Sequence, residues 1–242
     1  MNFKETVNQL GIDLDFCAVS PSGGTFHLKA MDIAPMEFLV LAEEDFVKGG
    51  IASSVNSITN AKRAIVSQMD QILISFGYKS LPWNIPQKIK MLKDLGVLLP
   101  PILRKISKTR NLLEHEYKKP GKEDVESALD IASLYVWGMS SLFNGLCDEI
   151  QFGFDKCYDN QRDEYKKYID FGITSEKEEV FYRGYAYEFK EVDGKEQRMT
   201  HEIKIKNSEP IFFAIVRIAI AFNTGYKIDE SIKIFDQVFK NT

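Results

Sequence analysis

An arginine, an asparagine and a histidine lie close together near the middle of this 242-residue chain. They are Arg110, Asn111 and His115, in the stretch KTRNLLEHEYKKPGKED. An imidazole exchanges a proton near neutral pH, and arginine offers a planar fork of donors that matches phosphate oxygens. Asparagine orients the imidazole ring or binds a sugar or phosphate oxygen. These residue types suit RNA cleavage in which a 2′-hydroxyl attacks the adjacent phosphorus, His115 moves protons and Arg110 stabilises phosphoryl charge. Arg110, Asn111 and His115 are therefore the candidate catalytic residues, and the alternative at this point is an ordinary solvated face on which Glu114 and Glu116 flank the histidine.

A helix over this stretch would place a polar face opposite an apolar stripe. At about 100° per residue, the stripe that starts at Ile102 lies opposite Asn111 and His115, while Arg110 lies at its edge. Three cations on the polar face are predicted to bind RNA phosphates: Arg104, Lys108 and Lys118. No acidic cluster with the spacing of metal ligands accompanies the trio, so no metal and no cofactor are expected.

Charge is distributed unevenly along the chain. The formal net charge is -4, which argues against a protein that coats nucleic acid over its whole surface. Residues 86–122 nevertheless contain ten Lys/Arg and three Asp/Glu, about +7, and the remainder therefore carries about -11. The predicted phosphate-binding cations lie within that basic segment.

The elements that would position the trio change character along the chain. Residues 1–34 are expected to form strands around the turn SPSGG, and residues 35–150 an antiparallel bundle of helices with short connections. Residues 151–242 are expected to contain a helix over 159–172, a hairpin around Asp193-Gly194 and two terminal helices. The predicted fold class is thus α+β, mainly α: a helical bundle with a smaller C-terminal region that contains a β-hairpin.

The three cysteines and the hydropathy pattern bear on the compartment. Cys17, Cys147 and Cys157 include no C-x-x-C pair, which fits a reducing cytosol rather than a disulfide framework. The N-terminus lacks an apolar stretch of signal-peptide length, and the run IFFAIVRIAIAF is too short to span a bilayer. A cytoplasmic protein without a membrane segment is expected.

The motif TRNLLEHEYKKP, with helices expected on both sides, resembles the HEPN family (higher eukaryotes and prokaryotes nucleotide-binding domain). The family signature is an arginine, commonly followed by a polar residue such as asparagine, four to six residues before a histidine. Arg110, Asn111 and His115 match it, and the resemblance covers roughly residues 35–150. It implies a HEPN-like helical bundle and a metal-independent endoribonuclease that works as a homodimer, in RNA-targeting toxins or antiviral defence. An antitoxin or other regulatory protein would then be a partner.

Two other functions remain open at this level. A HEPN bundle can lack activity and only bind a nucleotide or a protein partner, with the C-terminal part as the recognition surface. A purely structural helical scaffold would leave both the trio and the basic segment as coincidence. The intact trio favours the ribonuclease.

Aromatic residues alternate in the stretch FYRGYAYEF, so one set is expected to pack and the other to face solvent. The solvent-facing set could stack on bases or could be an ordinary wetted strand face. His27 and His201 lie on expected strands with no catalytic partner near in sequence, and they are left out of the predicted site.

Overall fold

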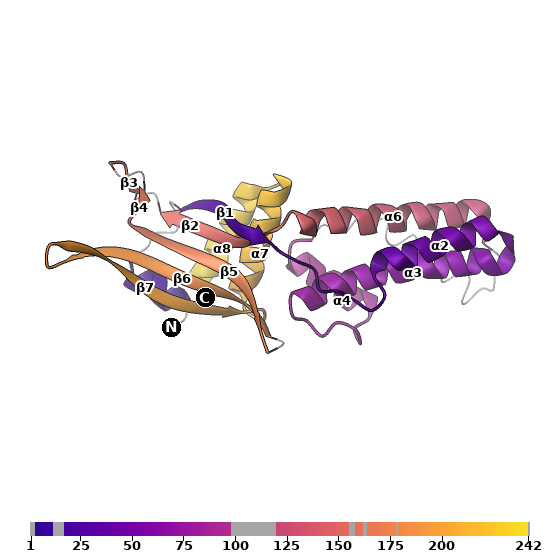
Figure 1. Cartoon of the computed structure of the whole chain (residues 1–242), viewed down its shortest axis with the longest axis horizontal. Coiled ribbons are helices and arrows are strands. Elements are labelled where there is room, and N and C mark those ends of the chain that lie inside the picture. Colours follow the sequence, from indigo (N-terminus) through magenta and orange to yellow (C-terminus); the bar gives the residue numbers. More distant parts are fainter. Residues whose placement is uncertain are drawn as a thin grey trace. The chain divides into compact units, whose positions relative to one another are not determined.

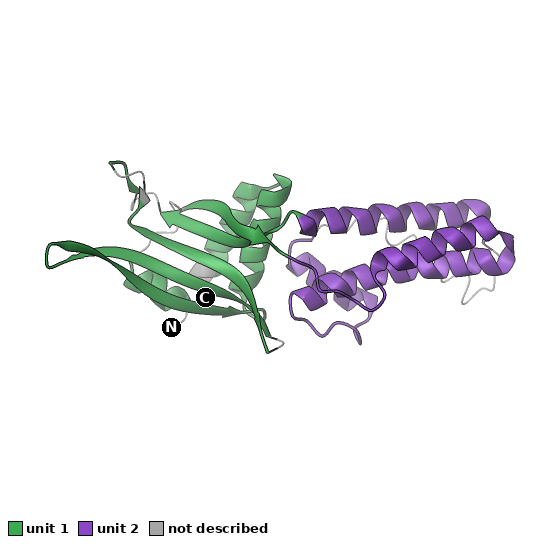
Figure 2. Cartoon of the chain, viewed as in Figure 1, with its two compact units in different colours: residues 1–26, 145–242 green, residues 27–144 purple. Residues whose placement is uncertain are grey.

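The computed structural model describes residues 3–11, 17–97, 120–154, 158–161, 164–177 and 179–241, and it divides the chain into two compact units. Unit 1 contains residues 1–26 and 145–242, and unit 2 contains residues 27–144 (Figure 2). The chain therefore leaves unit 1 after its first strand, forms unit 2 and returns to complete unit 1.

Unit 2 is helical in its described part (Figure 1). Its helices are α2 (Pro35–Lys48), α3 (Gly50–Ser75), α4 (Ile85–Asp94) and α6 (Lys122–Asn144). Proline starts α2, and the Glu37 carboxylate accepts a hydrogen bond of 2.6 Å from the backbone N–H of Ala34. Gly49 and Gly50 have φ values of 70° and 85°, which permits the sharp turn into α3. The helices expected at these places are confirmed.

Helix α3 forms the centre of unit 2, since it packs against α2, α4 and α6. Apolar side chains at helical spacing cover its inner faces and are almost fully buried: Ile58, Ile65, Met69, Ile72 and Leu73. Helix α6 contributes a matching buried stripe from Val125 to Phe143. The periodicity of apolar residues thus accounts for the packing of this unit.

Unit 1 is built on a five-stranded antiparallel sheet with the strand order β1-β2-β5-β6-β7 (Figure 1). Its strands are β1 (Cys17–Thr25), β2 (Cys147–Phe154), β5 (Lys167–Glu176), β6 (Glu179–Val192) and β7 (Lys195–Lys206). Strands β3 (Tyr158–Asp159) and β4 (Glu164–Tyr165) form a separate pair. Helices α1 (Phe3–Gln9), α7 (Pro210–Thr224) and α8 (Ile228–Asn241) pack against one face of the sheet.

Aromatic rings join these helices to that face of the sheet. Phe152 of β2 stacks on Phe235 of α8 with ring centroids 4.8 Å apart. Phe3 of α1 lies 5.4 Å from Phe171 of β5, and Tyr182 of β6 lies 5.1 Å from Phe212 of α7. Because side chains alternate along a strand, the residues between these positions point to the opposite face.

The expected hairpin around Asp193-Gly194 is confirmed. Val192 of β6 pairs with Lys195 of β7, and the two turn residues have φ values of 52° and 72°. Positive φ at both central positions of a two-residue loop matches the right-handed twist of the strands. The local sequence determines this part of the sheet.

The expected fold class is wrong in the weight that it gives to the two parts. The β-structure is a five-stranded sheet rather than one hairpin in a smaller C-terminal region, and one strand comes from the N-terminal segment. The helix expected to continue to residue 150 ends at Asn144, and β2 begins at Cys147. The protein is an α+β structure in which the sheet organises a whole unit.

The turn expected at SPSGG is also wrong, because β1 runs through it. Pro21 pairs with Ile150 of β2, and the register shifts between Ser22 and Thr25 as in a β-bulge. Proline is tolerated there because β1 is an edge strand. Gly24 donates its backbone N–H to the Asp148 carboxylate at 2.6 Å, which holds the bulge against β2.

The helix expected over residues 159–172 is replaced by strands β3, β4 and the first half of β5. Ile169 and Phe171 are fully buried while Asp170 between them is not, which is the two-residue period of a strand. The polar residues at the start of the 159–172 stretch gave the sequence a pattern similar to that of an amphipathic helix.

Candidate functional site

The predicted ribonuclease site lies among residues 98–119, which the structure does not describe. Its six residues lie outside the described part of the chain: Arg104, Lys108, Arg110, Asn111, His115 and Lys118. On one side the description ends at Val97, shortly after α4, and on the other it resumes at Pro120. The backbone N–H of Gly121 donates to the Asp124 carboxylate at 2.9 Å, at the start of α6.

A buried ion pair fixes α4, the last described helix before that gap. The Lys88 Nζ lies 2.5 Å from Oδ2 of Asp70 on α3, and the Ser80 hydroxyl donates to Oδ1 of the same carboxylate at 2.6 Å. The side chains of Lys88 and Asp70 are 4% and 7% exposed. A lysine so enclosed is closed to any large substrate. Its structural effect is to lock α4 and the preceding loop onto α3.

The two described histidines have different surroundings. His27 is exposed and follows the end of β1, so it does not lie on the strand expected for it. His201 is half-buried on β7, where it pairs with Ala186 of β6. In the described ranges, no group of three or more His, Cys, Asp and Glu side chains could hold a metal ion.

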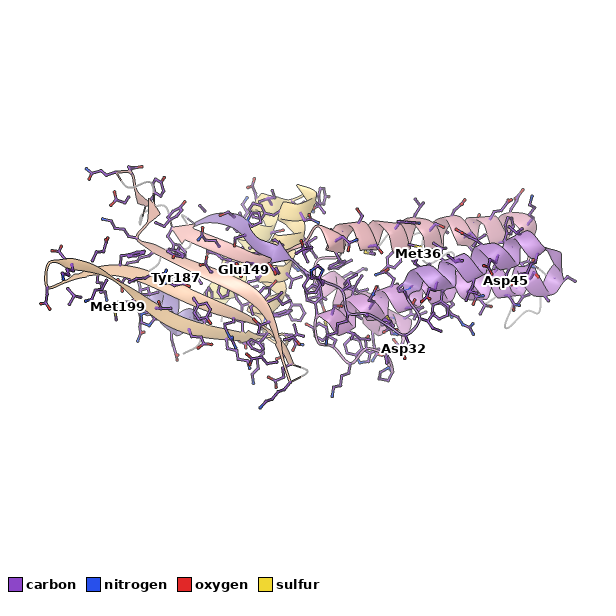
Figure 3. The ribbon with its side chains drawn as sticks, in the orientation of Figure 1. Asp32, Met36, Asp45, Glu149, Tyr187 and Met199 are labelled. Atoms are coloured by element: carbon purple, nitrogen blue, oxygen red, sulfur yellow. The ribbon has the colours of Figure 1, made fainter. Side chains whose placement is uncertain are left out.

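A cluster of aromatic and polar side chains lies on the sheet face opposite the helices. Tyr168 of β5 pairs with Tyr187 of β6, and their rings stack with centroids 4.6 Å apart. The Tyr185 ring lies 6.4 Å from that of Tyr187, which Figure 3 labels among the side chains of the sheet. Arg198 of β7 places its guanidinium carbon 4.9 Å from the Tyr187 ring centroid. With Asp170 and Gln151, these residues form what we call the tyrosine cluster.

Asp170 provides the acceptor of the tyrosine cluster. It pairs across the sheet with Gln151 of β2 on one side and with Tyr185 of β6 on the other. Burial raises the pKa of the Asp170 carboxyl above its ordinary value, and the hydrogen bond from Gln151 and the charge of Arg198 offset this only in part. Oδ1 of Asp170 is buried and accepts no hydrogen bond from the described residues. Because this oxygen is itself buried, a ligand can donate to it once a neighbouring side chain moves aside.

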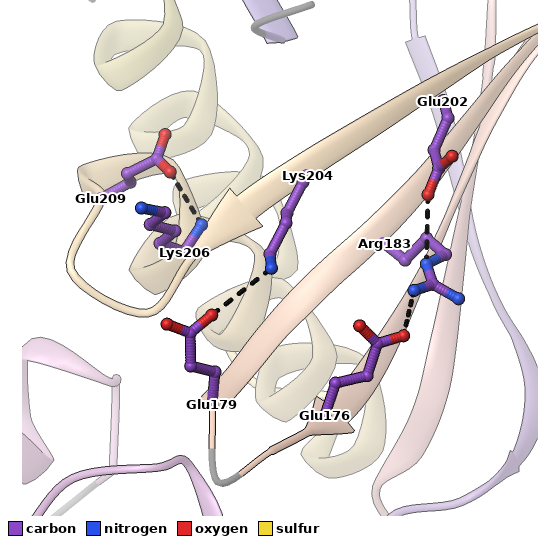
Figure 4. Close-up of polar contacts among 7 residues, drawn as sticks. All are labelled: Glu176, Glu179, Arg183, Glu202, Lys204, Lys206 and Glu209. Carbon is purple, nitrogen blue, oxygen red and sulfur yellow. Dashed lines mark hydrogen bonds and ion pairs between the residues drawn. The ribbon is translucent and has the colours of Figure 1, made fainter.

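Other cations on this face are engaged by carboxylates of the same sheet (Figure 4). Arg183 of β6 pairs with Glu176, and its Nε lies 3.3 Å from Oε1 of Glu202. The Lys204 Nζ lies 3.4 Å from Oε2 of Glu179 and 3.8 Å from the centroid of the Phe181 ring. Arg198 differs from them, because its guanidinium lies over the Tyr187 ring and forms no ion pair with a carboxylate among the described residues.

The aromatic alternation in β6 indicated part of the tyrosine cluster in advance, since it placed Tyr185 and Tyr187 on one face. The other members come from three further strands and meet them through the sheet register: Gln151, Tyr168, Asp170 and Arg198. Without the pairing of β2 with β5, no sequence signal brings Gln151 and Asp170 together.

Comparison with known proteins adds no assignment: no family model, curated protein or solved structure matches this chain. In the described part of the chain, none of the helices combines the length and the apolar character needed to cross a membrane.

Proposed function

We propose that this protein is a metal-independent endoribonuclease of the HEPN type, with Arg110, Asn111 and His115 as its catalytic residues. The observation that carries the proposal is the trio itself, an Arg-Asn pair followed by a histidine with four residues between Arg110 and His115. Support comes from its context. The trio lies between α4 and α6 in a segment of about +7, within a unit whose described elements are helices.

The proposed reaction is an internal transesterification. The O2′ of one nucleotide attacks the adjacent phosphorus, and the bond from phosphorus to the O5′ of the next nucleotide breaks. His115 takes the proton of the 2′-hydroxyl, and an acid returns a proton to the leaving O5′. Arg110 stabilises the added negative charge on the phosphoryl oxygens, and Asn111 orients the imidazole or the ribose. The products are a 2′,3′-cyclic phosphate and a 5′-hydroxyl.

A homodimer would supply the second histidine of this reaction. A two-fold interface places a residue opposite its own copy or a near neighbour, so two His115 side chains could share one cleft. The two basic segments of such a dimer would repel each other, so an apolar surface must hold the two copies together. Helix α6 offers one. Leu134 and Trp137, one helical turn apart, are 76% and 62% exposed. Replacing Trp137 by Glu should convert the dimer to a monomer, as measured by light scattering, and should reduce cleavage.

The proposed role is that of an RNA-targeting toxin or defence nuclease in the cytoplasm, restrained by an antitoxin or another regulatory protein. Such a role requires that the free nuclease is harmful to its host cell. Induced expression of the wild-type chain should therefore arrest growth, whereas the His115→Ala chain should not.

The direct test is RNA cleavage in EDTA. The wild-type chain should cut a labelled RNA. His115→Ala should lose cleavage because it removes the group that transfers the proton, and Arg110→Ala because it removes the charge that stabilises the phosphoryl oxygens. His27→Ala is the matched control, since that histidine is exposed and lies outside the trio. Equal cleavage by the wild type and His115→Ala would exclude the trio as the site.

The alternative function is a non-catalytic HEPN-type module that binds a nucleotide or a partner. The tyrosine cluster favours it, because aromatic rings beside a carboxylate suit recognition rather than cleavage. RNA binding without cleavage in any buffer would select this alternative.

A further inference from the structure

We infer that the tyrosine cluster of unit 1 binds single-stranded RNA by holding a guanine base on Tyr187. The inference concerns a different unit from the catalytic trio, and it rests on the proposed function only for the choice of RNA as the ligand. The four tyrosine-cluster residues that would contact the nucleotide are Tyr187, Tyr168, Asp170 and Arg198.

The present occupant of the Tyr187 ring indicates the shape of the ligand. The Arg198 guanidinium carbon lies 4.9 Å from the ring centroid, so a planar group that carries N–H donors already fits there. Guanine contains the same unit of one carbon bonded to three nitrogens, and its N1–H and 2-amino group point from one edge. Arg198 is close enough to Asp170 to act on its charge, although no ion pair joins the two among the described residues. The larger guanine ring on Tyr187 would extend its donor edge toward Asp170.

Asp170 explains why a base with two adjacent donors is preferred. A carboxylate accepts through both oxygens, and paired N–H donors match this geometry. One oxygen of Asp170 is buried without a hydrogen bond from the described residues, while Gln151 donates to the carboxylate. An acceptor that is buried and unpaired is costly, so a ligand that donates to it gains from relieving that cost.

Arg198 makes the cluster complementary to a nucleotide rather than to a cation. A lysine or arginine side chain of a peptide would meet the positive charge of Arg198 beside the ring. A nucleotide brings N–H donors for Asp170 and a phosphate for Arg198, which then moves from the ring to the phosphate. Arg198 lies on an exposed part of β7, where its side chain has room for that movement.

The neighbouring rings allow more than one base of a strand to be held. Tyr168 stacks on Tyr187, and Tyr165 of β4 lies over Gly153 of β2, where a Cβ would approach the Tyr165 ring to 2.6 Å. Glycine at that position thus leaves room for the Tyr165 ring, and Gly153 pairs across the strands with Tyr168, which pairs with Tyr187. A row of rings across a sheet is suited to an extended single strand.

Fluorescence anisotropy tests the inference with labelled RNA of about ten nucleotides, a length typical of one such surface. The RNA is uridine-rich with a single guanosine, and a second RNA carries inosine, which lacks the 2-amino group, at that position. The measurements use the full chain with His115→Ala, so that the RNA is not consumed. Cleavage is measured separately with His115 in place.

The guanosine RNA should bind several-fold more tightly than the inosine RNA. Tyr187→Leu should weaken binding by about 5- to 150-fold, as expected for loss of one stacked base, and Tyr187→Phe should not. Asp170→Asn should abolish the difference between guanosine and inosine. Tyr226→Ala, which removes an exposed tyrosine between α7 and α8, is the control and should leave binding unchanged. Circular dichroism of each variant checks that unit 1 is folded.

Unchanged affinity in Tyr187→Leu and Asp170→Asn would overturn the inference even if the RNA is cleaved. Equal affinity for free guanosine monophosphate, or tighter binding of an arginine-rich peptide, would overturn it as well, because the ligand would not be an RNA strand. Loss of binding in Tyr187→Leu without any cleavage by the His115 chain would uphold the inference and reject the proposed nuclease.

Discussion

Removing the Lys88 ammonium should destabilise unit 2 far more than removing a surface lysine from the same helix. In Lys88→Met, the Asp70 carboxylate keeps the Ser80 hydroxyl but loses the ammonium 2.5 Å away, and its side chain is only 7% exposed. Breaking a buried pair by removing one partner costs about 3 to 5 kcal/mol, because the remaining charge is desolvated and unpaired. The expected loss is a large fraction of the stability of a domain of this size.

The matched control is Lys90→Met, also on α4. Lys90 pairs with Asp94 at 3.0 Å, but the two side chains are 80% and 42% exposed. An exposed pair of this spacing is worth about 0.3 to 0.5 kcal/mol. The double variant Asp70→Leu/Lys88→Met should recover most of the loss, since both charges are then absent.

Urea unfolding followed by tryptophan fluorescence measures these differences. Trp83 and Trp137 are the two tryptophans of the chain and both belong to unit 2, so the signal reports this unit. Lys88→Met should lower the urea midpoint by about 1 M or more, and Lys90→Met by a few tenths at most. Equal midpoints for the two single variants would refute the assignment of a structural role to the buried pair.

Three further predictions concern unit 1 and the predicted RNA-binding segment. Gly184→Ala should cost about 1 to 3 kcal/mol in tyrosine circular dichroism melts, because its Cβ would come within 2.5 Å of the buried Phe171 ring. Asp170→Asn should stabilise the protein at neutral pH, because the raised pKa of Asp170 in the folded state means that its ionisation opposes folding. Below about pH 4 the carboxyl is protonated in both states, so thermal unfolding measured at several pH values should show no stabilisation there. Replacing all three predicted phosphate-binding cations by alanine should reduce the slope of log affinity for RNA against log salt concentration by about 2. An unchanged slope in anisotropy titrations would reject the assignment of these cations to phosphate binding.

Local sequence patterns were sufficient for elements whose partners are near in the chain. The helices of unit 2 follow from apolar periodicity and from punctuation such as Pro35 and Gly49-Gly50, and the β6–β7 hairpin follows from Asp193-Gly194. Each of these signals acts within a few residues, which is the range over which sequence reasoning is strong.

The features that could not be predicted from the sequence depend on pairing between strands that are far apart in the chain. Strand β1 pairs with β2, with Pro21 opposite Ile150, and the segment from Pro21 to Gly24 accommodates a bulge rather than a turn. The same pairing decides the candidate sites. Alternation alone placed Tyr185 and Tyr187 on one face, but the meeting of Asp170 with Gln151 depends on the register of β2 and β5. The catalytic trio was read from the sequence alone, and it remains a prediction.

The central claim is that His115 and Arg110 promote attack by a 2′-hydroxyl, and the chemistry of the new RNA ends tests it most directly. Mass spectrometry of a short RNA cut in EDTA reads both ends at once. The account predicts a 2′,3′-cyclic phosphate on one fragment and a 5′-hydroxyl on the other, with neither formed by His115→Ala. A 3′-hydroxyl with a 5′-phosphate, or cyclic phosphate formed equally by His115→Ala, would contradict it.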